Sequence, residues 1–195
     1  MAPVAAPAAF PARVMGRTGL SVCRLGLGSS YMAPASSYEE AFERGVNYFY
    51  WGSLRRDTMG AALKKLAPGH REKLLIVLQS YARLGSLVMR SAESALRRLD
   101  ISYGDVLLLG WHNRPPGKRV MDAAMRLVDR GLVRHVAVSG HHRAMFPTLR
   151  DDPRISIWHV RYNAVHRGAE RDVFPIPRRA PLPASAWHHH PHLKP

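Results

Sequence analysis

The sequence predicts a parallel α/β fold, and three observations support this prediction. Residues 105–109 form an almost unbroken apolar run, which is typical of a strand that helices cover on both faces. Helical patterns flank this run, at residues 91–99 before it and at residues 118–130 after it. Strand-like and helix-like segments alternate along the chain every 25 to 30 residues or so, roughly the size of a βα unit with a right-handed crossover.

The predicted elements follow one another in a regular order. A hairpin is expected at residues 14–22, because Gly16 to Gly19 have the composition of a turn. Six strands are expected at residues 24–29, 46–51, 73–78, 105–109, 133–138 and 155–161. A capping box of Ser37 and Glu40 predicts the start of the first helix. Later helices are predicted at residues 58–66, 91–99, 118–130, 144–150 and 168–174.

Two architectures fit this order of elements: an open doubly wound sheet, or part of an eight-unit barrel. No G-x-G-x-x-G motif joins a strand to a helix, and Gly26-Leu27-Gly28 alone is a weak match, which argues against the doubly wound dinucleotide fold. We therefore predict a (β/α)8 barrel of the TIM type that is incomplete, with about six βα units and an N-terminal β-hairpin.

Composition limits the classes of protein that remain. The 195 residues are 46% hydrophobic, which is enough for one domain, and the single cysteine, Cys23, excludes a disulfide framework. No apolar run approaches the roughly 20 residues that span a bilayer, so we expect a cytoplasmic protein. The net charge of +15 is spread along the chain rather than gathered in one block, so a nucleic-acid-binding protein stays open but is not favoured.

The chain divides into three parts by composition. Residues 1–13 are rich in Ala and Pro and are expected to be a disordered leader. Residues 14–174 carry the regular pattern of the partial barrel. Residues 175–195 are rich in Pro and His and lack periodicity, so we expect a disordered tail with no further strand, rather than a metal site in its histidine cluster.

Short motifs in residues 14–174 resemble the aldo/keto reductase family. They are met in the family's order at residues 15–22 with 25–28, 45–49, 96–99 with 103–105, 131–134 with 138–140, and 161–163. The resemblance implies an NAD(P)H-dependent oxidoreductase of carbonyl and alcohol substrates on a (β/α)8 barrel. It also implies that strands seven and eight, and the loops that hold the adenosine phosphate, are missing after residue 174.

The family's chemistry rests on an Asp, a Tyr, a Lys and a His, and the resemblance places Tyr50, Arg55, Gln79 and Gly110 at these positions. The Tyr acts as a general acid whose pKa is lowered by the Lys. Arg55 is a poor proton donor near neutral pH, Gln79 carries no charge, and Gly110 has no side chain. We therefore expect the chain to be inactive or strongly impaired.

Two other residues are candidates for a replacement acid. His112 would point to the same side as Gly110 if the strand continued, and would stand about 6 to 7 Å further along it. Tyr50 is a phenol at the tetrad's Asp position, and Tyr81 is a further phenol nearby in sequence. Each of these side chains could instead be an ordinary solvated or packed residue.

The cofactor side is also altered relative to the family. Gly28, Ser29 and Ser30 match the loop that approaches the nicotinamide ribose. Ser139 matches the serine of the pair that holds the carboxamide, Gly140 replaces the asparagine of that pair, and His159 stands where glutamine is usual. The resemblance thus implies NADPH as cofactor, with weakened binding, and no metal.

Three functions remain open. The chain is a carbonyl-reducing enzyme, a non-catalytic relative or truncated fragment, or a basic nucleic-acid-binding protein. The substrate, if there is one, is expected to be a small carbonyl compound. Because strands one and six would have open edges, association through them is also expected.

Overall fold

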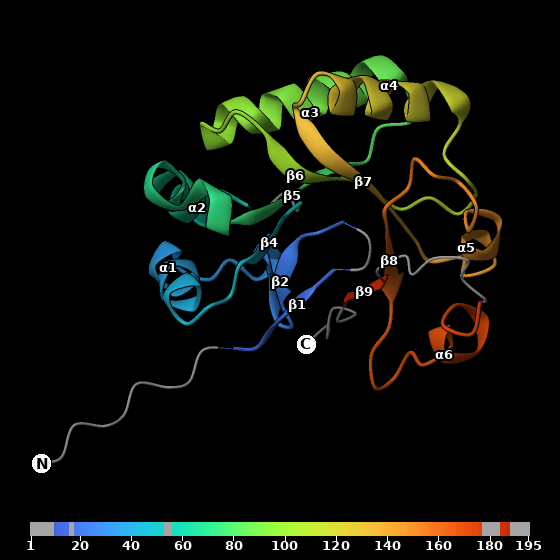
Figure 1. Cartoon of the computed structure of the whole chain (residues 1–195), viewed down its shortest axis with the longest axis horizontal. Coiled ribbons are helices and arrows are strands. Elements are labelled where there is room, and N and C mark those ends of the chain that lie inside the picture. Colours follow the sequence, from blue (N-terminus) through green and yellow to red (C-terminus); the bar gives the residue numbers. More distant parts are fainter. Residues whose placement is uncertain (1–9, 16–17, 53–55, 177–183, 188–195) are drawn as a thin grey trace, which may run out of the picture.

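The computed structural model describes residues 10–15, 18–52, 56–176 and 184–187, the last segment as backbone only. A seven-stranded parallel sheet has the order β3-β4-β5-β6-β7-β8-β9. It curls so that the helices lie outside it (Figure 1). The strands are β3 (Gly26–Gly28), β4 (Tyr48–Trp51), β5 (Leu75–Ser80), β6 (Gly104–Leu109), β7 (Val133–Gly140), β8 (Ile157–Arg161) and β9 (Ala184–Trp187).

The helices alternate with these strands, as predicted. They are α1 (Ala35–Glu43), α2 (Asp57–His70), α3 (Gly85–Leu99), α4 (Lys118–Asp129), α5 (Met145–Thr148) and α6 (Ala169–Asp172), with short 3-10 helices at Ser29–Tyr31 and Arg71–Lys73. The predicted incomplete (β/α)8 fold, a curled parallel sheet with helices and an N-terminal hairpin, is confirmed.

Strand β6 lies at the centre of the sheet, and all six of its residues are buried. Leu107 and Leu109 face the outer layer, where they pack with α3 and α4. Val106 and Leu108 face the concave interior. The buried side chains there form what we call the inner cluster: Val22, Tyr48, Tyr50, Leu75, Val77, Val106, Leu108, Ala137 and Ile157. Burial on both faces explains why this strand lacks alternation, and each such side chain stabilises the fold by about 1.5–3 kcal/mol.

The hairpin closes the amino-terminal end of the inner cluster. Strands β1 (Ala12–Val14) and β2 (Ser21–Cys23) pair antiparallel, and Val22 packs into the inner cluster. Asn47, just before β4, fastens the hairpin, since its side chain accepts a bond from the Cys23 amide at 2.8 Å and donates to the Ser21 carbonyl at 2.8 Å. Gly16 and Arg17 of the predicted turn lie outside the described residues.

The predicted capping box of α1 is wrong. The helix begins at Ala35 with Pro34 as its N-cap, and the Ser37 amide already bonds to the Pro34 carbonyl. Ser37 therefore lies inside the first turn, where it caps nothing, and Glu40 pairs with Arg44 instead. Pro34 explains the earlier start, because its fixed φ suits the chain entering a helix.

The tail differs from its prediction at one segment. Ala184–Trp187 forms β9 and pairs parallel with β8, with Trp158 opposite Ala184 and Arg161 opposite Trp187. The expectation that no strand follows residue 174 was therefore wrong. A four-residue segment among prolines has no periodicity to detect, whereas the open edge of β8 offers it backbone partners. Residues 177–183 and 188–195 of the tail and residues 1–9 of the leader lie outside the described residues.

Candidate functional site

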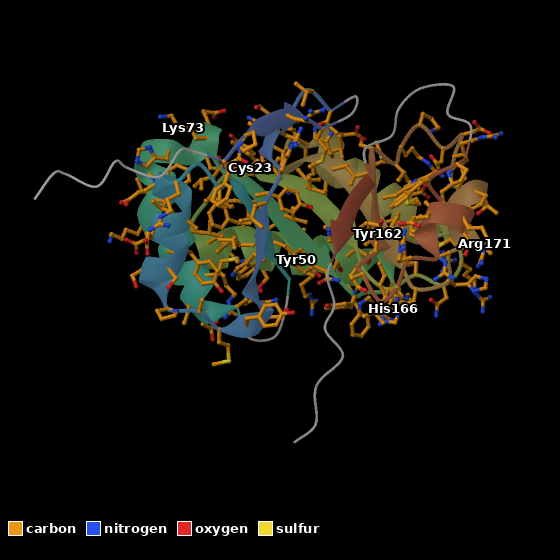
Figure 2. The ribbon with its side chains drawn as sticks, turned by 90° about the horizontal axis from the view of Figure 1, so that it is seen from below. Cys23, Tyr50, Lys73, Tyr162, His166 and Arg171 are labelled. Atoms are coloured by element: carbon orange, nitrogen blue, oxygen red, sulfur yellow. The ribbon has the colours of Figure 1, made fainter. Side chains whose placement is uncertain are left out.

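The candidate site lies at the carboxyl ends of the strands, inside the curl of the sheet. Strand register places Tyr50 opposite Val77, Gln79 opposite Leu108, and Ser139 opposite His159. Val77, Leu108 and Tyr50 belong to the inner cluster, so these neighbours face the same interior. Figure 2 shows Tyr50 in the middle of the molecule, whereas Arg171 lies at its periphery.

Tyr50 contacts residues of two different strands in this interior, Gln79 on β5 and His159 on β8. Its hydroxyl donates a hydrogen bond to Oε1 of Gln79 on the neighbouring strand. Its ring lies 5.5 Å from the ring of His159 on β8, measured between centroids. The two predicted residues Tyr50 and His159, distant in sequence, are thus brought together across the interior by the curl of the sheet.

Gln79 fills the space where a side chain at residue 110 would go. A Cβ atom built on Gly110 falls well inside van der Waals distance of Nε2 of Gln79. On the other side of the amide, a Cβ on Gly52 would lie 2.5 Å from Oε1 of Gln79. Gln79 is therefore seated between two glycines and bonded to Tyr50, and a histidine at position 110 requires Gln79 to move.

The electrostatics of Tyr50 do not favour proton release. Burial raises its pKa well above the usual range, and the neighbouring Tyr81 raises it further. Burial also raises the pKa of Tyr81, although its contacts with Tyr50 and Gln79 oppose this. A phenol acts as an acid near neutral pH when a cation lowers its pKa, and here the shift has the opposite sign.

His112 does not take the place that a continued strand would give it. Strand β6 ends at Leu109, and Trp111 adopts a φ of 54°, which turns the chain away from the strand direction. The His112 amide then bonds to the Ser139 carbonyl at 2.7 Å, and His112 lines a pocket together with Arg83 and Val120. Val120 is part of the outer layer, so this pocket lies beside the first turn of α4.

The imidazole of His112 is neutral at physiological pH. It is 5% exposed, and burial, with a further contribution from the charge of Arg83, lowers its pKa to about 4. His112, a candidate acid in the sequence, is therefore a buried imidazole in its neutral form.

The positions that the family resemblance predicts for the cofactor lie at the ends of β3, β7 and β8. Gly28 ends β3 and Ser29 is fully buried, with Ser30 half-buried beside it. The Ser139 hydroxyl accepts a bond from the Trp111 amide at 3.1 Å, so one of its acceptor sites is used within the fold. A Cβ on Gly140 would overlap the His112 carbonyl, which leaves no room for the asparagine that the family places there.

His159 completes the altered cofactor side. It is buried, and burial lowers its pKa to about 4, so its ring is neutral. A neutral imidazole, with one donor and one acceptor nitrogen, thus packs on Tyr50 at the position where the family resemblance predicts an amide. Of the three positions that the resemblance predicts for the carboxamide, residue 139 keeps its serine, whereas Gly140 has no side chain and residue 159 carries an imidazole.

Arg83 is a site residue that sequence reasoning missed. Its guanidinium donates to the carbonyls of Tyr81 at 2.7 Å, Gly110 at 3.1 Å and Trp111 at 2.8 Å, and so fixes the loops after β5 and β6. No sequence signal marks it among 29 Lys and Arg residues. Arg55 lies outside the described residues.

Neither a metal centre nor a membrane span emerges from the described residues. They contain no group of three or more His, Cys, Asp or Glu side chains able to hold a metal ion. None of their helices has the length and apolar character needed to cross a bilayer.

A curled parallel sheet with a hairpin at its amino-terminal end and polar groups at its carboxyl end defines an α/β barrel protein. The model of the aldo/keto reductase family matches residues 27–187, and the chain belongs to that family. The match extends past residue 174, where we had expected it to end, and includes β9. It is a family of NAD(P)H-dependent oxidoreductases that act on small carbonyl compounds.

Individual relatives are distant. The chain is 28% identical to methylglyoxal reductase YeaE of Escherichia coli over 124 residues, which cover 61% of this chain and 44% of that protein. It is 24% identical to L-galactose dehydrogenase of Arabidopsis thaliana over 165 residues, which cover 71% of this chain and 51% of that protein. The chain thus spans about half the length of these relatives.

Solved structures show the same fold. The thermostable aldo-keto reductase Tm1743 superposes with a TM-score of 0.71 at 24% identity, over 84% of this chain and 66% of that one. The aldo-keto reductase AKR11C1 from Bacillus halodurans gives a TM-score of 0.70 at 19% identity, over 78% of this chain and 58% of that one.

Proposed function

We propose that this chain is an aldo/keto reductase relative that does not reduce carbonyl compounds, or does so only with strong impairment. The observation that carries the proposal is the position of the Gln79 side chain, which is hydrogen-bonded to Tyr50 and fills the space beside Gly110. An uncharged amide stands where the family has a lysine, and the adjacent phenol has a raised pKa. The site therefore offers a substrate carbonyl no activated proton donor.

Weakened binding of NADPH is part of the same proposal. Gly28, Ser29, Ser30 and Ser139 are the residues that would contact the nicotinamide end, through backbone and hydroxyl groups. Gly140 and His159 supply none of the amide hydrogen bonds that the family uses.

The test separates binding from turnover. NADPH fluorescence is titrated with the full chain, and NADPH oxidation is then followed with nitrobenzaldehyde, beside an active aldo/keto reductase. Weak cofactor binding, or none, with no oxidation above the buffer rate supports the proposal. Oxidation at a rate near that of the active control would overturn it. Steep salt-dependent binding to DNA without NADPH binding would instead select a nucleic-acid-binding protein.

Two further expectations belong to this proposal. The chain associates through the edges of its sheet, because β3 is an edge strand and Leu25, Tyr31 and Met32 around it are exposed. Light scattering tests this, and a monomer at all concentrations contradicts it. A cytoplasmic location is tested by cell fractionation.

A further inference from the structure

Four large apolar side chains are exposed at the carboxyl rim, where α3 begins. Tyr81 is 43% exposed, and Leu84 and Leu87 are 61% and 44% exposed. Trp111, on the loop after β6, is 47% exposed, and its ring centroid lies 5.0 Å from that of Tyr81. We call these four side chains the rim patch. Apolar residues that are exposed as a group, with polar residues around them, commonly mark a site of interaction.

The rim patch is built from two segments that are fastened to each other. The loop after β5 runs into the first turn of α3, where the Leu87 amide bonds to the Leu84 carbonyl at 3.1 Å. These two leucines are three residues apart, so they lie on one side of the turn. The Arg83 guanidinium donates to the Tyr81 carbonyl at 2.7 Å and to the Trp111 carbonyl at 2.8 Å. The loop that carries Trp111 is therefore held beside the start of α3.

The surroundings of the rim patch are cationic. Arg83 and Arg114 line the same pocket as Trp111. Arg114 also lines a second pocket, together with His141 and His142. Within the described part of the chain, neither pocket has a carboxylate side chain in its lining. The exposed apolar surface is thus bordered by positive charge, which favours an occupant with negative charges.

Other occupants of the rim patch fit this combination less well. A second copy of the chain would bring the same arginines face to face, and each copy carries a net charge of +15. A nucleic acid would pair with the arginines, but its phosphates offer nothing to exposed leucines. Attachment to an anionic membrane takes clusters of about four to eight Lys and Arg residues, whereas two arginines line the pocket beside Trp111. An acidic polypeptide segment with apolar side chains uses both parts of the surface.

We propose that the rim patch is a docking site for an acidic segment of a partner protein that also carries apolar anchor residues. Trp, Tyr and Arg are the residue types that dominate the energetics of protein interfaces. The leucines and the two aromatic rings bury the anchors, and Arg83 and Arg114 attract and orient the carboxylates. Anchors of this kind bind best in pockets, and one lies beside Trp111. The interaction is reversible and uses neither the inner cluster nor the cofactor positions.

Fluorescence anisotropy tests the proposal with the full chain and a labelled peptide of glutamate, leucine and one tryptophan. The peptide has about 15 residues, or roughly four helical turns. One control peptide has serine in place of every leucine and of the tryptophan, and the other has glutamine in place of every glutamate. We expect saturable binding of the first peptide, about tenfold tighter than that of either control, because charge and apolar anchors both contribute. Vesicles of phosphatidylserine with phosphatidylcholine, and a double-stranded DNA oligonucleotide, are titrated in parallel.

Two matched pairs of variants locate the site. Leu84→Glu and Val165→Glu change the net charge equally at exposed positions, but Val165 lies in the loop between β8 and α6. Leu84→Glu should weaken peptide binding by about tenfold or more, and Val165→Glu by less than about twofold. Arg114→Gln should weaken it by about fivefold, whereas Arg24→Gln, at the exposed end of the hairpin, should leave it nearly unchanged. All four side chains are exposed, so the variants should fold, and circular dichroism checks this.

Three results would overturn the proposal. The first is the absence of saturable binding of the acidic peptide. The second is an equal loss of affinity within each pair of variants, which would indicate attraction to net charge alone. The third is tighter binding of vesicles or DNA than of the peptide, with the same sensitivity to Leu84→Glu. None of these measurements involves NADPH, so a failure here is distinct from a failure of the proposed non-catalytic role.

Discussion

The two ends of the sheet treat buried polar groups in opposite ways. At the amino-terminal end, Asp105 is 2% exposed but fully paired, with Arg71 at 2.8 Å and the Ile76 amide at 2.9 Å. Arg134 adds a longer contact at 3.5 Å. At the carboxyl end, Tyr50, His159 and His112 are buried and neutral. Burial raises the pKa of Tyr50 and lowers the pKa of both histidines, so none of the three exchanges a proton near pH 7.

This difference separates scaffold from site. At the amino-terminal end, the contacts of Asp105 join β5, β6 and β7, as expected of the stabilising end of a barrel. The carboxyl end, where barrel enzymes carry their chemistry, holds a phenol and an amide bonded to each other. If stability and function are divided in this way, substitutions at the two ends of the sheet should have different effects.

The largest effect is expected from Asp105→Ala. It leaves the largely buried Arg71 guanidinium without its carboxylate and should destabilise the fold by about 3–5 kcal/mol in urea unfolding. Asp57→Ala is the control, because it breaks the exposed pair with Arg98 and should cost less than about 1 kcal/mol. Equal losses in the two variants would contradict the structural role of Asp105.

Acid should destabilise the chain through its buried imidazoles. The pKa of His159 and of His112 falls from 6.5 in the unfolded chain to about 4 in the fold, so the unfolded state binds more protons between these values. Stability is therefore full above pH 6.5 and declines as the pH falls towards 4, by at most about 3 kcal/mol per imidazole. His159→Gln should flatten the pH dependence of urea unfolding, and an unchanged slope would contradict it.

A smaller effect is expected from Gly110→Ala. The new methyl group meets Gln79, which has Gly52 and Tyr50 on its other sides, and overpacking of this kind costs about 1–3 kcal/mol. The double variant with Gln79→Ala removes the clash with Gln79 and leaves a contact with Cδ1 of Tyr81 at 3.0 Å, so the two changes should be strongly non-additive in a double-mutant cycle. Simple additivity would show that Gln79 does not occupy this space.

The smallest effect is expected from Tyr50→Phe. It removes the hydroxyl that donates to Gln79 and should cost about 1 kcal/mol in thermal unfolding. Any residual oxidation of NADPH should be unchanged, because Tyr50 is not expected to act as an acid. A drop in that residual rate would identify Tyr50 as a proton donor after all.

Much of the fold could be predicted from patterns that are local in the chain. The apolar run of β6 and the apolar stripes of α3 and α4 each carry their own signal, and these three elements lie where the sequence placed them to within a few residues, except for the first turns of α3. The start of α1 was misplaced because two capping signals, Pro34 and Ser37, compete within four residues.

The candidate site was predicted only in part, for reasons that concern distance in the chain. Tyr50, Gln79, Ser139 and His159 were named from sequence, and the structure brings them to one face. The direction of His112 was not predictable, because it depends on the left-handed backbone of Trp111. Arg83 was missed because its role is to bind carbonyls 27 and 28 residues away.

The sequence by itself determined the parallel strands, their helices and the residue types at the carboxyl rim, because periodicity and composition act over a few residues. Only the tertiary structure decided that Gln79 lies between Gly52 and Gly110, that His112 lines a pocket beside α4, and that Ala184–Trp187 becomes a strand. These three outcomes depend on space and on unpaired backbone groups supplied by other segments, which no local pattern records.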